Sequence, residues 1–261
     1  MYHKLASLLH LLLVAFQVQL STQAHVNIPG RVLSSTRNIP KRTLAGVSVV
    51  DTPVVRAADN YARQYLDDFA YKHVMRTWLF GVLIIEHNAT LRNTVDVEVH
   101  AVSALLHDMG WDITPGSPFV SPDKRFEVDG AIAAREFLGN NKHGKHWDDR
   151  RVQLVWDSIA LHTQPSLFNF KELEVMTTGS GISSDFVGPL LGITEKEYTT
   201  IVAEFPNEDM LKGYNDTITW FCQSKPSTTY DTWMQPWGEN YVHNYSAKGH
   251  RMFDVVPVFA H

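Results

Sequence analysis

Apolar residues recur at helical spacing along most of the chain, and this periodicity predicts a helical fold. From residue 57 to 69 they fall on one face, opposite charged residues, as in a helix that packs on a core. The same spacing predicts helices over residues 70–85, 98–108, 125–138, 152–163, 195–204 and 209–223. Few segments alternate apolar and polar residues with the period of a strand. We therefore predict an all-α fold in a single domain.

Segments without this periodicity set the predicted domain boundaries. Residues 25–55 contain several prolines, serines and threonines, which predicts an extended arm or linker. A loop rich in proline, serine and glycine spans residues 113–122, and the glycines of residues 179–188 predict a turn that leads into another helix. The predicted domain covers residues 56–240, and residues 241–261 form a C-terminal tail.

The first residues of the chain have the pattern of a secretory signal. Lys4 precedes an apolar run from Leu5 to Phe16, and small residues follow before a predicted cleavage near residue 24. A membrane anchor is the alternative, but the run is shorter than the roughly 20 apolar residues that span a bilayer. Residues 1–24 therefore predict a secreted protein or one of the secretory-pathway lumen, without a stable membrane anchor. Glycosylation sequons begin at Asn88, Asn215 and Asn244.

Composition excludes several classes of function. The formal net charge of the 261-residue chain is -5 and no basic block occurs, so we expect no nucleic-acid partner. Cys222 is the only cysteine, which excludes an intrachain disulfide, and no neighbour in the sequence would acidify its thiol for catalysis. A small-molecule substrate fits this composition, and assembly as a homo-oligomer stays open.

A histidine and an aspartate stand side by side at the end of the predicted helix 98–108. His107 has the small residues Ser103 and Ala104 one turn before it, which leaves room for a bound group. Adjacent residues of a helix diverge by roughly 100° around its axis. His107 and Asp108 can therefore share an ion only if it lies at the rim between them.

Further candidate ligands lie on other predicted helices. His73 and Arg76 are three residues apart and point the same way, His162 continues a buried apolar stripe, and Asp185 lies on the helix into which the glycine-rich segment leads. A single buried histidine is more often a hydrogen-bonded core residue than a ligand. Several histidines on separate helices, with an adjacent carboxylate and no thiolate, favour a catalytic divalent transition metal.

The ordered pattern of His73, His107-Asp108 and Asp185 resembles the HD-domain metalloproteins. That family is an all-helical bundle, so the resemblance implies that these four side chains bind the ion. Residues 55–240 are more narrowly similar to the fungal cyanamide hydratase branch, in motifs that occur in the same order. These are RTWLFG (76–81), ALLHDMGWD (104–112), RFEVDGA (125–131), VWDSIALHT (155–163) and KPSTTYDTW (225–233).

Departures from the wider superfamily narrow the expected chemistry. Phe126 stands where dinuclear relatives carry an extra histidine, and Thr163 follows His162 where they carry a second histidine. Trp111 replaces the glutamate of the related nucleotidases. The resemblance therefore implies one ion rather than two, and it gives less support to phosphate hydrolysis. Zinc is the favoured ion, with iron and manganese as alternatives.

The resemblance implies that water adds to a small nitrile, and cyanamide, which would give urea, is the first substrate to test. A divalent ion with an open position lowers the pKa of a bound water to about 7. His162 would carry the proton, or would instead be a further ligand. Glu127 and Asp129 would orient water or ligands, or would only complement the dipole at a helix start. Arg76 would hold a ligand carboxylate.

Two other functions stay open. One is a nucleotide phosphohydrolase, whose cationic groups near the ion would be Arg76, Lys124 and Arg125. The other is a secreted binding protein without catalysis, which would bind through its aromatic tail. The aromatic residues of that tail are Trp233, Trp237, Tyr241 and Tyr245. A secreted enzyme could also act on a related nitrile, an isocyanide or a small amide instead of cyanamide.

Overall fold

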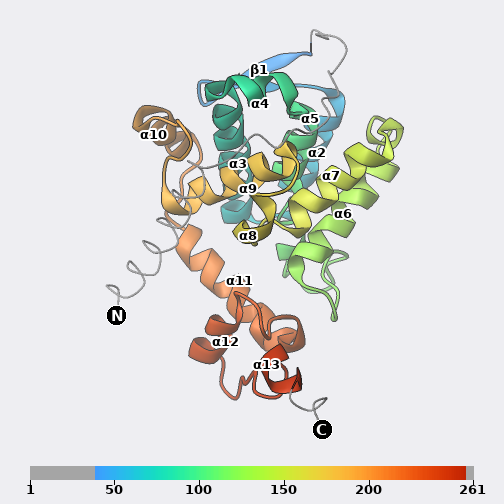
Figure 1. Ribbon diagram of the computed structural model, residues 1–261, viewed down its shortest axis with the longest axis vertical. Coiled ribbons are helices and arrows are strands. Elements are labelled where there is room, and N and C mark those ends of the chain that lie inside the picture. The colour runs from blue at the N-terminus through green and yellow to red at the C-terminus, as the bar shows by residue number, and fades with distance from the viewer. Residues whose placement is uncertain (1–38, 257–261) are drawn as a thin grey trace.

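A computed structural model describes residues 39–256, which fold as a body of helices with one two-stranded hairpin at its edge (Figure 1). The mostly helical architecture confirms the predicted all-α class. The expected signal, residues 1–24, lies outside the described residues. No described helix has the length and apolar character needed to cross a membrane.

The described elements follow one another in short steps along the chain. The first half contains β1 (Lys41–Leu44), β2 (Val47–Val50), α2 (Pro53–Tyr65), α3 (Asp68–His87), α4 (Ala89–Thr94), α5 (Val97–Leu106), the 3-10 turn η1 (Met109–Trp111), α6 (Phe126–Asn140) and η2 (Gly144–His146). The second half contains α7 (Asp149–Ala160), α8 (Pro165–Phe168), α9 (Leu173–Val187), α10 (Glu195–Glu204), α11 (Met210–Ser224), η3 (Pro226–Thr228), α12 (Gln235–Tyr241) and α13 (Met252–Val255).

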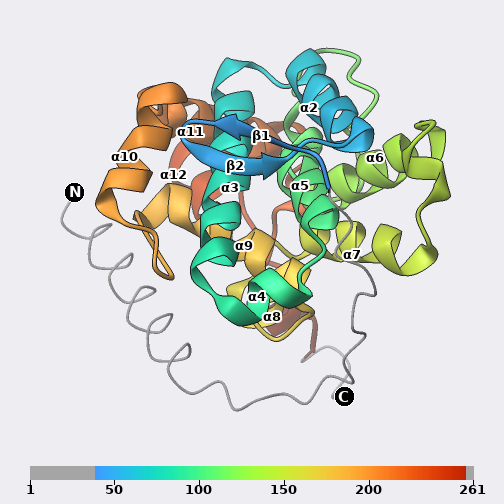
Figure 2. The same cartoon turned by 90° about the horizontal axis from the view of Figure 1, so that it is seen from above.

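Within the described part of residues 25–55, a hairpin takes the place of the expected extended arm or linker. Strands β1 and β2 pair antiparallel, and Ala45 (φ 47°) and Gly46 (φ 78°) make the tight turn between them. Figure 2 shows the hairpin lying across α3, where Val47 and Val49 are buried. Four-residue strands carry too little alternation to stand out in the sequence. Burial against the helices is what stabilises them.

Helices α3, α5 and α9 form the centre of the fold and approach one another at glycines. A Cβ on Gly81 of α3 would overlap the imidazole of His100 on α5. A Cβ on Gly181 of α9 would lie 2.7 Å from the carbonyl oxygen of Thr77. His100 is fully buried there and bonds to the Thr178 hydroxyl and the Trp78 carbonyl. It is therefore a hydrogen-bonded core histidine.

The glycine-rich segment 179–188 is helical, which corrects the expectation of a turn there. Helix α9 runs through it without interruption to Val187. A Cβ on Gly179 would lie 2.7 Å from the ring of Phe168, so this glycine provides space for α8. Only Gly188, with φ 96°, ends the helix. Close packing between helices explains the other glycines.

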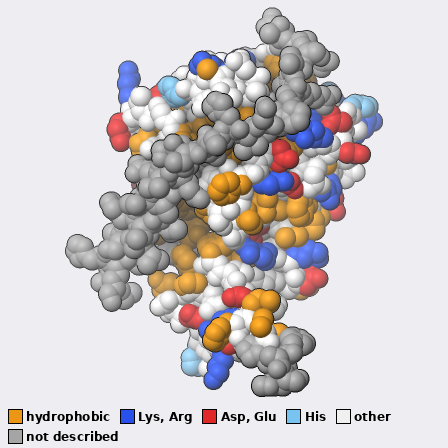
Figure 3. Space-filling view, in the orientation of Figure 1, with side chains coloured by type: hydrophobic (Ala, Val, Ile, Leu, Met, Phe, Trp, Pro, Cys, Tyr) orange, Lys and Arg blue, Asp and Glu red, His pale blue; other side chains and the backbone are white. Residues whose placement is uncertain are grey.

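The C-terminal elements α11, α12 and α13 extend away from the helical body (Figure 1). The predicted tail, 241–261, is not without structure within its described part. Tyr245 packs on Tyr230 and covers Gly238, and α13 follows. Figure 3 shows hydrophobic side chains at the surface of this end, where Met252 and Phe253 are exposed.

Candidate metal centre

The His-Asp pair lies in a turn instead of inside a helix. Helix α5 ends at Leu106, His107 keeps helical angles, and Asp108 leaves them at φ -100° and ψ 18°. A Cβ on Gly130 of α6 would lie 2.8 Å from the carbonyl oxygen of His107, so that glycine lets α6 pack directly beneath the turn. The backbone change lets both side chains point to one place, whereas two adjacent residues of a continuous helix would meet only at the rim between them.

His73, His107 and Asp108 come together as a buried group that could hold a metal ion. The Nε2 atoms of the two histidines are 3.2 Å apart, and they lie 3.6 Å and 3.2 Å respectively from Asp108 Oδ2. Two ligands about 2.1 Å from a tetrahedral ion lie about 3.4 Å apart. The three observed distances therefore match the ligand-to-ligand distances around a single tetrahedral ion.

The hydrogen bonds of three imidazoles leave their Nε2 atoms bare. Nδ1 of His107 donates to the Ala104 carbonyl at 2.9 Å, and Nδ1 of His162 donates to the Ile159 carbonyl at 2.7 Å. Nδ1 of His73 lies 2.6 Å from a carboxylate oxygen of Asp185. In the neutral tautomer that these acceptors select, each Nε2 presents a lone pair to the shared centre.

Asp108 has the environment of a metal ligand. Its side chain is 1% exposed, and neither oxygen receives a hydrogen bond from any residue that the structure describes. A buried carboxylate without donors, facing imidazole lone pairs, is costly unless a cation lies between them. The donor set therefore fits a divalent cation.

His162 lies at the edge of this group. Its Nε2 is 3.8 Å from Asp108 Oδ1, and its ring packs on that of His107 with centroids 4.9 Å apart. Burial, with the nearby His107, lowers the pKa of His162 to about 4. His162 is therefore neutral at pH 7, and the lone pair of its Nε2 can take a proton or bind an ion.

Asp185 does not join the other three candidate ligands. One of its oxygens accepts from His73 Nδ1, and both accept from Arg76, at 2.6 Å and 2.7 Å. Burial raises the pKa of Asp185, yet His73 and Arg76 hold it below its ordinary value. In this arrangement Asp185 orients His73 from behind. Arg76 in turn fixes Asp185, a carboxylate that lies outside the group of three candidate ligands.

Glu127 is buried beside the centre and accepts hydrogen bonds from three side chains. Arg125 donates to both of its oxygens, the Thr163 hydroxyl donates at 2.7 Å and the Trp233 indole at 3.1 Å. Burial raises the pKa of Glu127, but Arg125 reverses this and the pKa falls below its usual range. Glu127 is thus an ionised carboxylate that ties three segments together, with three of these hydrogen bonds on Oε1 and one on Oε2.

Asp129 is likewise held in a structural role. Lys225 Nζ lies 2.8 Å from one oxygen, and both side chains are 3% exposed. Ser121 donates to the carboxylate through its backbone amide and its hydroxyl. The same ammonium also donates to the carbonyls of Ser121 and Lys124. Asp129 therefore fastens the loop before α6 to the end of α11, in place of the suggested catalytic role.

Aromatic side chains cover the candidate centre. Trp111 stacks on His73 at 6.2 Å, Phe126 packs on His162 at 5.6 Å, and Phe186 packs on His73 at 5.3 Å. Tyr214 of α11 adds a second layer through ring contacts with centroid distances between 5.4 Å and 6.0 Å. Its partners are Trp111 (5.6 Å), Phe186 (5.4 Å), Trp233 (6.0 Å) and Trp237 (5.7 Å).

Sequence reasoning missed Phe186 and Tyr214. Phe186 directly follows Asp185, which is the only signal for it, and nothing near Tyr214 in the sequence points to a site. Trp233 belongs to the aromatic stretch that the sequence offers as a binding surface. It instead packs against Phe126 and donates to Glu127.

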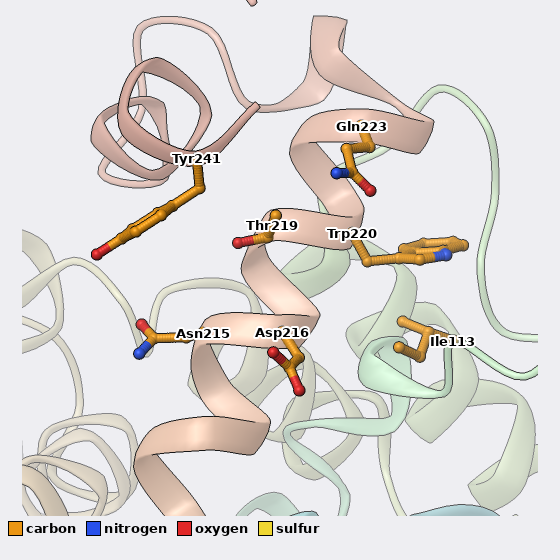
Figure 4. Close-up of a pocket in the computed structure, with 7 residues that line it drawn as sticks. All are labelled: Ile113, Asn215, Asp216, Thr219, Trp220, Gln223 and Tyr241. Carbon is orange, nitrogen blue, oxygen red and sulfur yellow. The ribbon is translucent and has the colours of Figure 1, made fainter. Parts of the chain in front are cut away.

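A separate groove of about 570 Å³ lies on the outer face of α11 (Figure 4). Asn215, Asp216, Thr219, Trp220 and Gln223 come from this helix, and Ile113 and Tyr241 complete the lining. Helical spacing places these positions opposite Tyr214, which faces the metal centre. The groove is therefore distinct from the candidate metal site.

The three sequons differ in accessibility. Asn88 and Asn244 are exposed at chain turns. Asn215 lies in α11, where its amide oxygen accepts from the Trp237 indole at 2.9 Å and its partner Thr217 is buried. The folded surroundings therefore favour Asn88 and Asn244 as glycan carriers over Asn215.

Comparisons with known proteins leave the family of this chain open: no protein-family model matches it, and no curated protein does.

Proposed function

We propose that this protein is a metal-dependent hydratase of the HD-domain type that adds water to a small uncharged nitrile, with cyanamide as the first substrate to test. The observation that carries the proposal is the Asp108 carboxylate, which is buried without a hydrogen-bond donor among the described residues and faces two bare imidazole nitrogens. His73, His107 and Asp108 would hold one divalent ion, with zinc favoured over iron or manganese. The expected place of action is outside the cell or in the secretory lumen.

Pairing of the nearby cations supports an uncharged substrate. Arg76 is held by Asp185, Arg125 by Glu127, and the exposed Lys124 by Asp123. A nucleotide phosphohydrolase would need cationic groups free to hold a phosphate. These three candidates already have carboxylate partners, and aromatic rings line the other sides. The pairing of these cationic side chains therefore gives little support to the alternative, a nucleotide phosphohydrolase.

Each buried side chain would have a defined part in the reaction. Asp185 fixes the orientation and tautomer of His73, so that its Nε2 is directed to the ion. The ion would ionise a water molecule at neutral pH and polarise the nitrile. Neutral His162 would take a proton at Nε2 and return it to the nitrile nitrogen. Trp111 and Phe126 would exclude bulk water from the reacting atoms.

A metal and product assay tests the proposal. The full chain, loaded with zinc, iron or manganese, is incubated with cyanamide and then with a series of small nitriles, isocyanides and amides. We expect urea from cyanamide with the loaded protein and none after chelation. His107→Ala should lose both metal and activity. A protein that binds none of the three metals would refute the proposal and favour a non-catalytic binding protein. Metal binding without turnover of any compound would refute the enzymatic part.

A further inference from the structure

The metal centre is closed to solvent in this conformation. His73 and Asp108 are each 1% exposed, His107 is 0% exposed and His162 is 6% exposed. Any ion or substrate must therefore pass side chains that cover these groups. Entry is easiest where the covering layer is thinnest.

Exposure identifies one of the covering rings. Three aromatic rings outside the centre contact the imidazoles of His73 and His162. Trp111 is 6% exposed and Phe126 is 1% exposed, whereas Phe186 is 43% exposed. Phe186 thus touches a candidate ligand on one side and water on the other.

Tyr214 is the partner of Phe186 in this layer. The two rings meet edge to face at 5.4 Å. Burial, then the charges of Asp108 and Glu127, raises the pKa of the Tyr214 phenol, so the ring lies within electrostatic reach of both carboxylates. Gly213 makes this position possible, because a Cβ there would overlap the ring of Phe69 and push α11 away from α3.

The position of Phe186 in α9 allows its ring to move. It is the second-last residue of the helix, and Gly188 ends the helix two residues later with φ 96°. Asp185, directly before it, is fixed by Arg76 and His73. A rotation of the exposed Phe186 side chain therefore uncovers His73 without moving the backbone that orients it.

We propose that Phe186 and Tyr214 cover the passage from solvent to the metal centre, and that the opening made when the Phe186 ring rotates admits only narrow, uncharged molecules such as linear nitriles. The substrate class rests on the proposed function. The passage itself does not, because it can be measured on metal-free protein without substrate.

Chemical labelling of histidines tests the passage. Diethyl pyrocarbonate, a small uncharged reagent, reacts with unprotonated imidazole nitrogen, and peptide mass spectrometry gives a rate for each histidine. In metal-free full-length protein we expect Phe186→Ala to raise the labelling rates of His73 and His107 by about two- to tenfold. In the wild type the reagent reaches these histidines only after the Phe186 ring breaks an aromatic contact, and the variant lacks that contact. Phe186→Trp should lower both rates. The exposed His143 should react equally in all variants.

Phe170→Ala is the matched control, because Phe170 is 67% exposed and has no ring contact with a candidate ligand among the described residues. It should leave His73 and His107 at their wild-type rates. Rates of His73 and His107 that do not change in either Phe186 variant would overturn the passage. So would an equal increase in Phe170→Ala, which would indicate general loosening. Failure of the protein to bind any metal would end the proposed function and leave these labelling rates unaffected.

Discussion

Alanine at His107 is expected to abolish the stabilisation that a bound metal gives, whereas alanine at His162 is expected to preserve it. A ligand that binds only the folded state stabilises it by about 4 kcal/mol at a free concentration about 1,000 times its dissociation constant. For a domain of this size each kcal/mol raises the unfolding midpoint by about 2–4 °C. Saturating zinc should therefore raise the wild-type midpoint by about 8–16 °C.

Geometry separates the two histidines. His107 Nε2 is 3.2 Å from both His73 Nε2 and Asp108 Oδ2, so its removal leaves only two of the three clustered donors. His162 Nε2 approaches the group only at 3.8 Å from Asp108 Oδ1. The shift caused by zinc should fall to near zero in His107→Ala, and it should stay at most of its wild-type size in His162→Ala.

The assay compares each variant with its own metal-free form, so the cost of the substitution to folding cancels. Unfolding midpoints with and without zinc are measured by calorimetry, and metal content by elemental analysis. Urea formation from cyanamide by His162→Ala should fall by roughly 10²–10⁴-fold, the usual contribution of a positioned acid or base. The exposed His143, replaced by alanine, is the control and should behave as wild type.

Loss of the zinc-dependent shift in His162→Ala, as complete as in His107→Ala, would refute the assignment of His162 as a proton carrier and make it a ligand. A zinc-dependent shift that survives in His107→Ala would refute the proposed ligand set.

Three further predictions concern groups outside the metal centre. Asp129→Ala should lower the free energy of unfolding by about 3–5 kcal/mol, because it leaves the buried ammonium of Lys225 unpaired, and urea denaturation would measure this. Gly81→Ala should destabilise the fold, because its Cβ would overlap the ring of His100. Gly139 lies at an exposed helix position with open space around it, so Gly139→Ala should stabilise the fold by about 1 kcal/mol. Thermal unfolding of both variants measures these two effects. Burial lowers the pKa of His100 to about 4 in the folded protein, from about 6.5 in the unfolded chain. The contribution of neutral His100 to the stability of the folded state is therefore complete above pH 6.5, and it is lost as the pH falls towards 4. Denaturation at a series of pH values should show a loss of about 3 kcal/mol over that range, and His100→Gln should reduce it.

Hydrophobic periodicity alone determines most of the helices. Apolar residues three and four apart predict residues 195–204 as a helix, and α10 spans Glu195–Glu204. The periodicity places the boundary between the first two helices after residue 69, whereas α2 ends at Tyr65 and α3 begins at Asp68. The observed boundary depends on Asp67, whose side chain caps α3 by accepting from the amide of Ala70.

The helical faces in the sequence directed His73, His107, Asp108, His162 and Asp185 to one interior, and the structure groups the first three of them. The sequence by itself could not determine the role of Asp185, Glu127 or Asp129. A carboxylate becomes a ligand, an orienting group or a structural anchor according to which cations and donors reach it. Those partners, Arg76, Arg125 and Lys225, are brought to them by packing between helices. Only the tertiary structure decides which buried carboxylate is paired within the protein, and which one, at Asp108, has no hydrogen-bond donor among the described residues.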